Sequence, residues 1–160
     1  MEETPRKKVS LIVFSGDMDK LFAAFSIATG AAASGMDVTM FFTFWGLRAL
    51  KKKVATGRSL FGRMLGRLYG GDIERAAPSR LSFGGLGRWM FKKMMKAKRV
   101  PSLTELRQTA IDLGVRLYGC ETSLTVMEIP REALIEEVQA CVGVAHFLEQ
   151  ARESDINLFI

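Results

Sequence analysis

Cysteine and histidine are scarce in this chain of 160 residues, which contains only Cys120, Cys141 and His146. The two cysteines form no CxxC pair, and no signal peptide is recognised, so we expect a reducing, cytoplasmic setting without a disulfide scaffold. A single histidine argues against a zinc site, and no resident metal is expected. No apolar run reaches the ~18 to 20 residues that are needed to span a bilayer.

Acidic residues are scarce in one part of the chain. The segment Arg48–Arg99 holds 15 lysine and arginine residues against two acidic residues, a net charge of +13, whereas the whole chain carries +6. The rest of the chain is therefore acidic. This asymmetry indicates a basic insertion in a globular domain rather than a uniformly basic protein.

Short apolar runs alternate with helical patterns along the remainder of the chain. Their continuous hydrophobicity is typical of strands that are covered on both faces, as in parallel sheets. We therefore predict an α/β fold: one three-layer α/β/α domain over residues 1–160, with a mainly parallel sheet of about five strands and a basic helical insertion at about 56–100. The expected strands are Lys8–Phe14, Val38–Phe44, Val115–Tyr118, Val138–Val142 and Ile156–Ile160.

Helices are expected between these strands and in the insertion. The clearest start signal is Ser102 with Glu105 three residues later, a capping box. Asp17 or Asp19 is expected to cap the first helix. The expected helices are 21–34, about 48–54, 60–69, 86–98, 103–113, about 121–127, 130–137 and 143–153.

Cys120 is the leading candidate for a functional residue. Gly119 permits a turn after the third strand, and Glu121, Thr122 and Ser123 can open a helix. This places the thiol at the carboxyl end of a strand, where open α/β sheets keep their ligand crevices. A helix amino terminus lowers the pKa of a thiol, while the neighbouring Glu121 acts in the opposite sense. The alternative is a buried cysteine that packs as a small apolar residue.

Other candidates lie near the same sheet edge. Asp17 could orient a substrate or tune the thiol, or it could only cap a helix. Trp45 could form the wall of a pocket or simply pack. Cys141 could act as a second thiol, although packing is the more common role of such a cysteine. His146 is interpreted as a structural histidine rather than as a base for Cys120.

The basic segment leaves several interpretations open. It could be a solvated flap, a surface buried between subunits, or a contact with an anionic membrane or an acidic partner. Nucleic-acid binding fits the charge, but no recognised nucleic-acid motif is present and the methionine and aromatic content is high, so this class is disfavoured.

Four stretches together resemble a known family. They are Lys8–Asp19 with its Ser-Gly-Asp-Met-Asp loop, Gly35–Leu47, Gly119–Leu124 followed by Met127, and Gly143–Ile160. In these stretches the chain resembles the DsrE/DsrF-like sulfur-transfer family, in its longer DsrE-like branch, which often carries a peroxiredoxin-like label. The small-Cys-x-x-Ser stretch is the most specific of these matches.

The resemblance implies homo- or hetero-oligomers, of which we favour a homo-oligomer, either a trimer or a hexamer. It also implies a cysteine that carries sulfane sulfur covalently as a persulfide without any cofactor. That cysteine maps onto Cys120, and sulfur donor and acceptor proteins or thiols are the implied partners. Around it, the expected cradle and pocket residues are Gly16, Asp17, Trp45, Gly119, Glu121, Thr122 and Ser123.

The leading hypothesis is a cytoplasmic sulfurtransferase or sulfur-relay protein, with enzymatic activity favoured but left open. The alternative is a non-catalytic oligomeric binding or scaffold module that docks on a membrane or an acidic partner through residues 48–99. A thiol redox enzyme of peroxiredoxin type is a third, less favoured class, because its paired thiol and activating arginine are not evident.

Overall fold

The sheet that the sequence predicts is present and entirely parallel. The computed structural model describes residues 5–68, 71–80 and 83–160, and in these residues five strands pair in the order β4-β3-β2-β1-β5. The strands are β1 (Lys8–Val13), β2 (Asp37–Phe42), β3 (Arg116–Cys120), β4 (Val138–Val142) and β5 (Ile156–Phe159).

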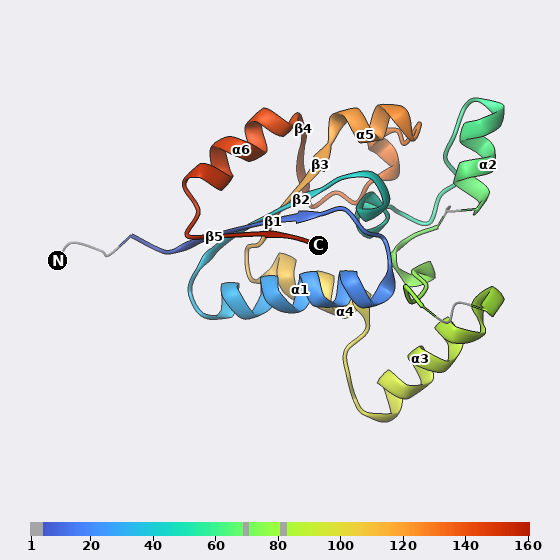
Figure 1. Ribbon diagram of the computed structural model, residues 1–160, viewed down its shortest axis with the longest axis horizontal. Coiled ribbons are helices and arrows are strands. Elements are labelled where there is room, and N and C mark those ends of the chain that lie inside the picture. The colour runs from blue at the N-terminus through green and yellow to red at the C-terminus, as the bar shows by residue number, and fades with distance from the viewer. Residues whose placement is uncertain (1–4, 69–70, 81–82) are drawn as a thin grey trace.

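Helices cover both faces of this sheet, which confirms the three-layer α/β/α prediction. Helices α1 (Met18–Ala33) and α4 (Leu103–Asp112) lie below the sheet in Figure 1, and α6 (Val144–Arg152) lies above it. The predicted capping box is formed, because the Ser102 hydroxyl accepts from the Glu105 N–H while the Glu105 carboxylate accepts from the Ser102 N–H. Asp17 occupies the N-cap position of α1 but makes no side-chain cap bond there.

The main hydrophobic core lies between the sheet and the α1–α4 layer. Leu11, Met40, Phe42 and Leu117 project from three neighbouring strands and are completely buried, as is Phe25 of α1. Burying one such side chain contributes about 1.5–3 kcal/mol. A smaller buried cluster on the other face contains Phe41, Cys120 and Phe147. Burial on both faces explains why the strands read as continuous apolar runs.

Two predicted helices differ from expectation, the first in position and type and the second in length. After β2 the chain forms a 3-10 helix, η1 (Phe44–Leu50), instead of a helix over 48–54. Its end is fixed because Lys51 forms an antiparallel bridge with Leu134, and the Ile135 N–H donates to the Leu50 carbonyl at 2.8 Å. The same pairing shortens the expected helix 130–137 to the 3-10 turn η4 (Arg131–Ala133).

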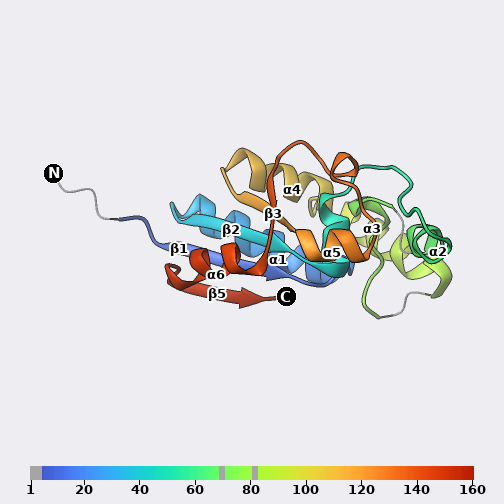
Figure 2. The same cartoon turned by 90° about the horizontal axis from the view of Figure 1, so that it is seen from above.

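The basic insertion forms separate helices beyond the carboxyl ends of the strands (Figure 2). They are α2 (Leu60–Leu68), η2 (Ile73–Arg75), η3 (Phe83–Gly85) and α3 (Leu86–Ala97). Ile73 and Ala76 between them are buried in the main core, so part of this segment is integral to the fold. Tyr69, the expected end of the first insertion helix, lies outside the described residues. Among the described residues, no helix is both long and apolar enough to cross a bilayer.

Glycine allows two chain segments to touch at the carboxyl end of β1. The Gly46 N–H donates to the Phe14 carbonyl at 2.8 Å. A Cβ at Gly46 would overlap the Val13 carbonyl, and one at Gly16 would overlap the Trp45 carbonyl oxygen. Only residues without a Cβ permit this approach of η1 to the end of β1.

Alanine substitutions should affect stability differently at Gly46, which lies in this close contact, and at a glycine in an open position of a helix. We expect Gly46→Ala to lower the free energy of unfolding by about 1–3 kcal/mol, because the added methyl group overpacks against Val13. Gly30→Ala is the matched control: Gly30 lies within α1, where a Cβ meets nothing within 4 Å, so this change should raise stability by about 0.5–1 kcal/mol. Urea unfolding followed by circular dichroism measures both, and equal effects would contradict the proposed crowding.

Candidate functional site

Cys120 lies where the sequence places it, at the carboxyl end of β3. It is the last residue of that strand and the N-cap residue of α5 (Glu121–Val126), with an extended backbone. The residue is buried, with 7% of its surface exposed. Gly119 before it is also buried, whereas Glu121 and Thr122 after it are exposed to solvent. Exposed residues therefore directly follow the buried thiol at the sheet edge.

Hydrogen-bond donors from two elements surround the sulfur. Burial raises the pKa of the Cys120 thiol, but hydrogen bonds with the hydroxyl and backbone N–H of Ser123, the Thr43 hydroxyl and the Thr122 N–H outweigh it. The resulting pKa lies below the ordinary value for cysteine. Donors of this kind stabilise the thiolate, which is the nucleophilic form of cysteine.

Thr43 is a site residue that sequence reasoning missed. It follows β2 directly and its hydroxyl oxygen lies 2.8 Å from that of Ser123, which is itself completely buried. Phe42 of β2 pairs in register with Gly119 of β3. The next residue along each chain segment, Thr43 or Cys120, therefore lies beside the other at the end of the sheet. The available signal was a hydroxyl residue at the end of the strand next to the cysteine-bearing strand.

An aromatic cluster packs on the same face as Cys120. The Phe41 and Phe147 rings stack with centroids 5.2 Å apart, and both residues are buried with the cysteine. His146 of α6 lies against Tyr118 at 5.3 Å between ring centroids, and its Nε2 atom is buried without a hydrogen-bond partner in the described part of the chain. This placement agrees with the structural interpretation of His146.

Cys141 is not brought together with Cys120. It pairs with Gly119 in the sheet, while Cys120 pairs with Val142. Because successive strand residues point to opposite faces, the two thiols are separated by the sheet. In agreement, the Cys141 sulfur lies 3.6 Å from where a Gly119 Cβ would be. Burial raises the pKa of Cys141, so its thiol is the less ionised of the two.

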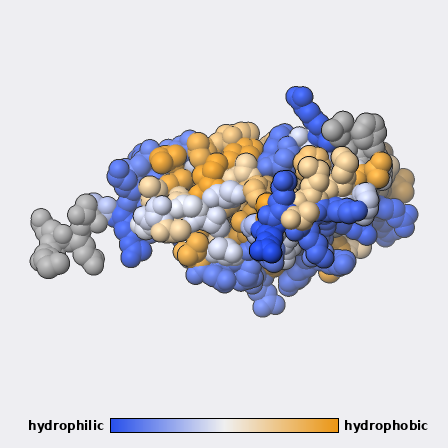
Figure 3. Space-filling view, turned by 90° about the horizontal axis from the view of Figure 1, so that it is seen from below, coloured by the Kyte–Doolittle hydropathy of each residue, from blue (hydrophilic) through white to orange (hydrophobic). Residues whose placement is uncertain are grey.

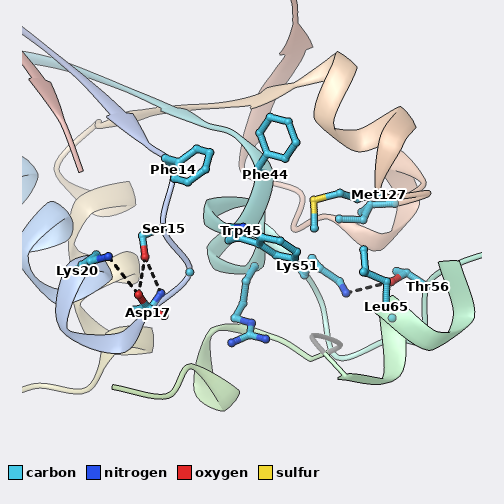
Figure 4. Close-up of a pocket in the computed structure, with 14 residues that line it drawn as sticks. Phe14, Ser15, Asp17, Lys20, Phe44, Trp45, Lys51, Thr56, Leu65 and Met127 are labelled. Atoms are coloured by element: carbon cyan, nitrogen blue, oxygen red, sulfur yellow. Dashed lines mark hydrogen bonds and ion pairs between the residues drawn. The ribbon is translucent and has the colours of Figure 1, made fainter. Parts of the chain in front are cut away.

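Gly16, Asp17 and Trp45 line a cavity of about 340 Å³ at the ends of β1 and β2, but Cys120 is not among its lining residues. Figure 4 shows this cavity, with Asp17 turned toward Ser15 and Lys20. The Asp17 carboxylate accepts from the Ser15 hydroxyl at 3.0 Å and lies 3.3 Å from the Lys20 ammonium. The expected site residues therefore fall into two groups. Those around Cys120, together with Thr43, form what we call the thiol cradle (Thr43, Gly119, Glu121, Thr122 and Ser123), and Gly16, Asp17 and Trp45 line the neighbouring cavity.

No group of three or more histidine, cysteine, aspartate or glutamate residues that could hold a metal ion occurs within the described ranges. The donors around Cys120 are hydroxyl and amide groups. Their arrangement suits an anionic sulfur.

Comparison with known proteins identifies a family and two similar relatives. The model of the DsrE/DsrF/DrsH-like family matches residues 5–159. The uncharacterized protein YrkE of Bacillus subtilis is 35% identical over 156 residues, which cover 96% of this chain and 97% of that protein. The sulfur carrier protein DsrE2 of Allochromatium vinosum is 33% identical over 159 residues, which cover 97% of this chain and 99% of that protein.

Solved structures share the fold at low sequence identity. The ychN protein from E. coli has a TM-score of 0.60 at 11% identity, with 96% of this chain and 99% of that chain covered. The protein MTH1491 of Methanobacterium thermoautotrophicum has a TM-score of 0.52 at 13% identity, with 95% and 98% covered. These two structures support the α/β/α architecture only.

Removal of the Ser123 hydroxyl should raise the pKa of Cys120, because the thiolate loses a donor while its burial remains. Thr43→Val should act in the same direction. Thr125→Val is a control, because that hydroxyl donates within α5 to the Glu121 carbonyl. The pH dependence of alkylation by iodoacetamide, in a Cys141→Ala background, gives each pKa. An unchanged midpoint in Ser123→Ala would contradict the assigned role of the hydroxyl.

Proposed function

Because this chain belongs to the DsrE/DsrF/DrsH-like family, we propose that it is a sulfur-relay protein that carries sulfane sulfur as a persulfide on Cys120. The observation that carries this proposal is the thiol cradle, in which hydroxyl and N–H donors lower the pKa of a cysteine at the carboxyl edge of the sheet. The 33% identity to a protein named as a sulfur carrier supports the same role.

The transfer proceeds by two thiolate attacks. The Cys120 thiolate attacks the outer sulfur of a donor persulfide, a new S–S bond forms, and the donor S–S bond breaks with its electron pair leaving on the donor thiolate. An acceptor thiolate then attacks the same outer sulfur and releases the Cys120 thiolate. One S–S bond replaces another in each step, so no external oxidant or reductant is needed.

The cradle suits the loaded state as well as the free thiol. A persulfide places its outer sulfur about 2 Å beyond the cysteine sulfur. The donors from Ser123, Thr43 and Thr122 remain close to the inner sulfur, which becomes anionic again when an acceptor removes the outer one. The exposed residues Glu121 and Thr122 lie beside the thiol, and we assign them to the path by which donor and acceptor thiols approach.

Incubation with glutathione persulfide should add about 32 Da to the intact protein, the mass of one sulfur atom, as measured by mass spectrometry. We expect Cys120→Ser to gain nothing and Cys141→Ser to load as the unaltered protein does. Equal loading of Cys120→Ser and the unaltered protein would contradict a persulfide on Cys120.

We propose membrane docking of the basic insertion as a second function, which its exposed apolar side chains favour. Leu60 and Phe61 of α2 are 81% and 75% exposed, and Trp89 of α3 is 60% exposed. Hydrophobic and hydrophilic residues lie side by side at this end of the molecule (Figure 3). The segment Arg48–Arg99, which contains these helices, carries a net charge of +13, and a basic residue close to an anionic bilayer contributes about 1 kcal/mol. An anionic lipid surface matches both the charge and the apolar side chains.

Anionic vesicles should shift the fluorescence of Trp89 to the blue, because its indole enters a less polar environment. A Trp45→Phe background leaves Trp89 as the only tryptophan. We expect the shift with phosphatidylserine-containing vesicles at low salt and not with phosphatidylcholine alone. A Leu60→Asp/Phe61→Asp variant should lose it, and Leu113→Asp, which changes an exposed leucine after α4, should keep it. No shift at low salt would exclude docking of this surface.

A further inference from the structure

The proposed sulfur chemistry does not use the cavity at the ends of β1 and β2. It has a volume of about 340 Å³, enough for a small ligand, and is closed on one side by the insertion through Thr56, Leu65 and Gly66. On the other side, η1 and the loop after β1 form its wall, and Figure 4 shows Phe44, Trp45 and Lys51 around the same space. Cys120 does not line it.

Lys51 places a buried positive charge in this cavity. Only 4% of the residue is exposed, and its ammonium donates to the Thr56 hydroxyl at 3.1 Å. It forms no ion pair with any carboxylate in the described residues. Burial and the nearby Arg48 lower the pKa of Lys51, while attraction from Asp72 acts in the opposite sense. A buried ammonium without an ion-pair partner is costly, and an anion in the cavity would offset that cost.

The other lining residues indicate what kind of anion fits. Lys20 and Arg48 add two positive charges, and Asp17, paired with Lys20, is the only acidic residue among the described residues that line the cavity. Aromatic and aliphatic side chains complete the wall, chiefly Phe44, Trp45 and Met127. A net positive cavity with apolar walls matches a charged head joined to an apolar body better than it matches an inorganic ion.

A strained backbone at Phe44 is a further observation that favours ligand binding in this cavity. Phe44 has a φ of 44°, a left-handed conformation that is costly for an aromatic residue. The conformation turns the chain directly after Thr43 so that Phe44 and the following Trp45 both line the cavity. Strained residues of this kind gather at ligand-binding sites.

We propose that this cavity binds a small organic anion, whose carboxylate, sulfonate or phosphate group pairs with Lys51 and whose apolar body packs on Phe44 and Trp45. The proposal concerns a ligand site beside the thiol cradle and is independent of whether Cys120 carries sulfur.

Benzenesulfonate is a suitable probe, and benzenesulfonamide is its neutral analogue of nearly the same shape. In a Trp89→Phe background Trp45 is the only tryptophan and reports on the cavity. We expect benzenesulfonate to change the fluorescence of Trp45 saturably. Benzenesulfonamide should require at least about tenfold higher concentrations, because the neutral analogue cannot form an ion pair with Lys51. Inorganic sulfate should bind far more weakly than benzenesulfonate.

Lys51→Met should weaken benzenesulfonate binding at least about tenfold, whereas Lys53→Met, which removes an exposed charge two residues away, should change it less than about twofold. Equal effects of the two variants would overturn the proposal. So would equal binding of the sulfonamide or of sulfate, or the absence of saturable binding by benzenesulfonate. The comparison of the probes needs no variant of Lys51, so it remains decisive if Lys51→Met does not fold.

Discussion

The parallel pairing of β2 with β3 is the constraint on which the rest of the site depends. Phe42 pairs with Gly119 in this register. The residues that follow them, Thr43 and Cys120, therefore lie next to each other at the carboxyl edge of the sheet. Ser123 joins them from α5 through its hydroxyl, 2.8 Å from that of Thr43. A shift of one residue in this pairing would turn Cys120 toward the opposite face and remove it from its donors. The register of this strand pair therefore also places the hydrogen-bond donors that lower the pKa of the thiol.

Much of this arrangement could be predicted from the sequence, because continuous apolar runs and a Gly-Cys step carry strong local signals. The five strands, the three layers and the place of Cys120 at a strand end follow from such signals. The 3-10 helix after β2 could not be predicted, because it ends at Lys51 through a bridge to Leu134, a residue more than eighty positions away in the sequence. Contacts of this separation have no local signature.

The division of the expected site into a cradle and a cavity also depends on three-dimensional contacts. Asp17 and Trp45 do lie at the predicted sheet edge, yet they face a space that Cys120 does not line. Strand order predicts that these residues lie at one edge of the sheet. It does not predict which way their side chains point, because that depends on the loop conformations. Lys51 illustrates the same limit. In the sequence it is the first of three consecutive lysines, and only the fold shows that it is buried while Lys53 is exposed.

The position of the two cysteines on opposite faces of the sheet also governs how the protein responds to oxidants. An oxidised thiol that has become a sulfenic acid is rescued when it condenses with a nearby thiol. Cys120 has no such neighbour within this chain, because a bond to Cys141, the other cysteine, would have to pass through the sheet. A sulfenic acid on Cys120 therefore needs a thiol from another molecule to form a disulfide. The same separation prevents an internal disulfide with Cys141, which would block the Cys120 thiol.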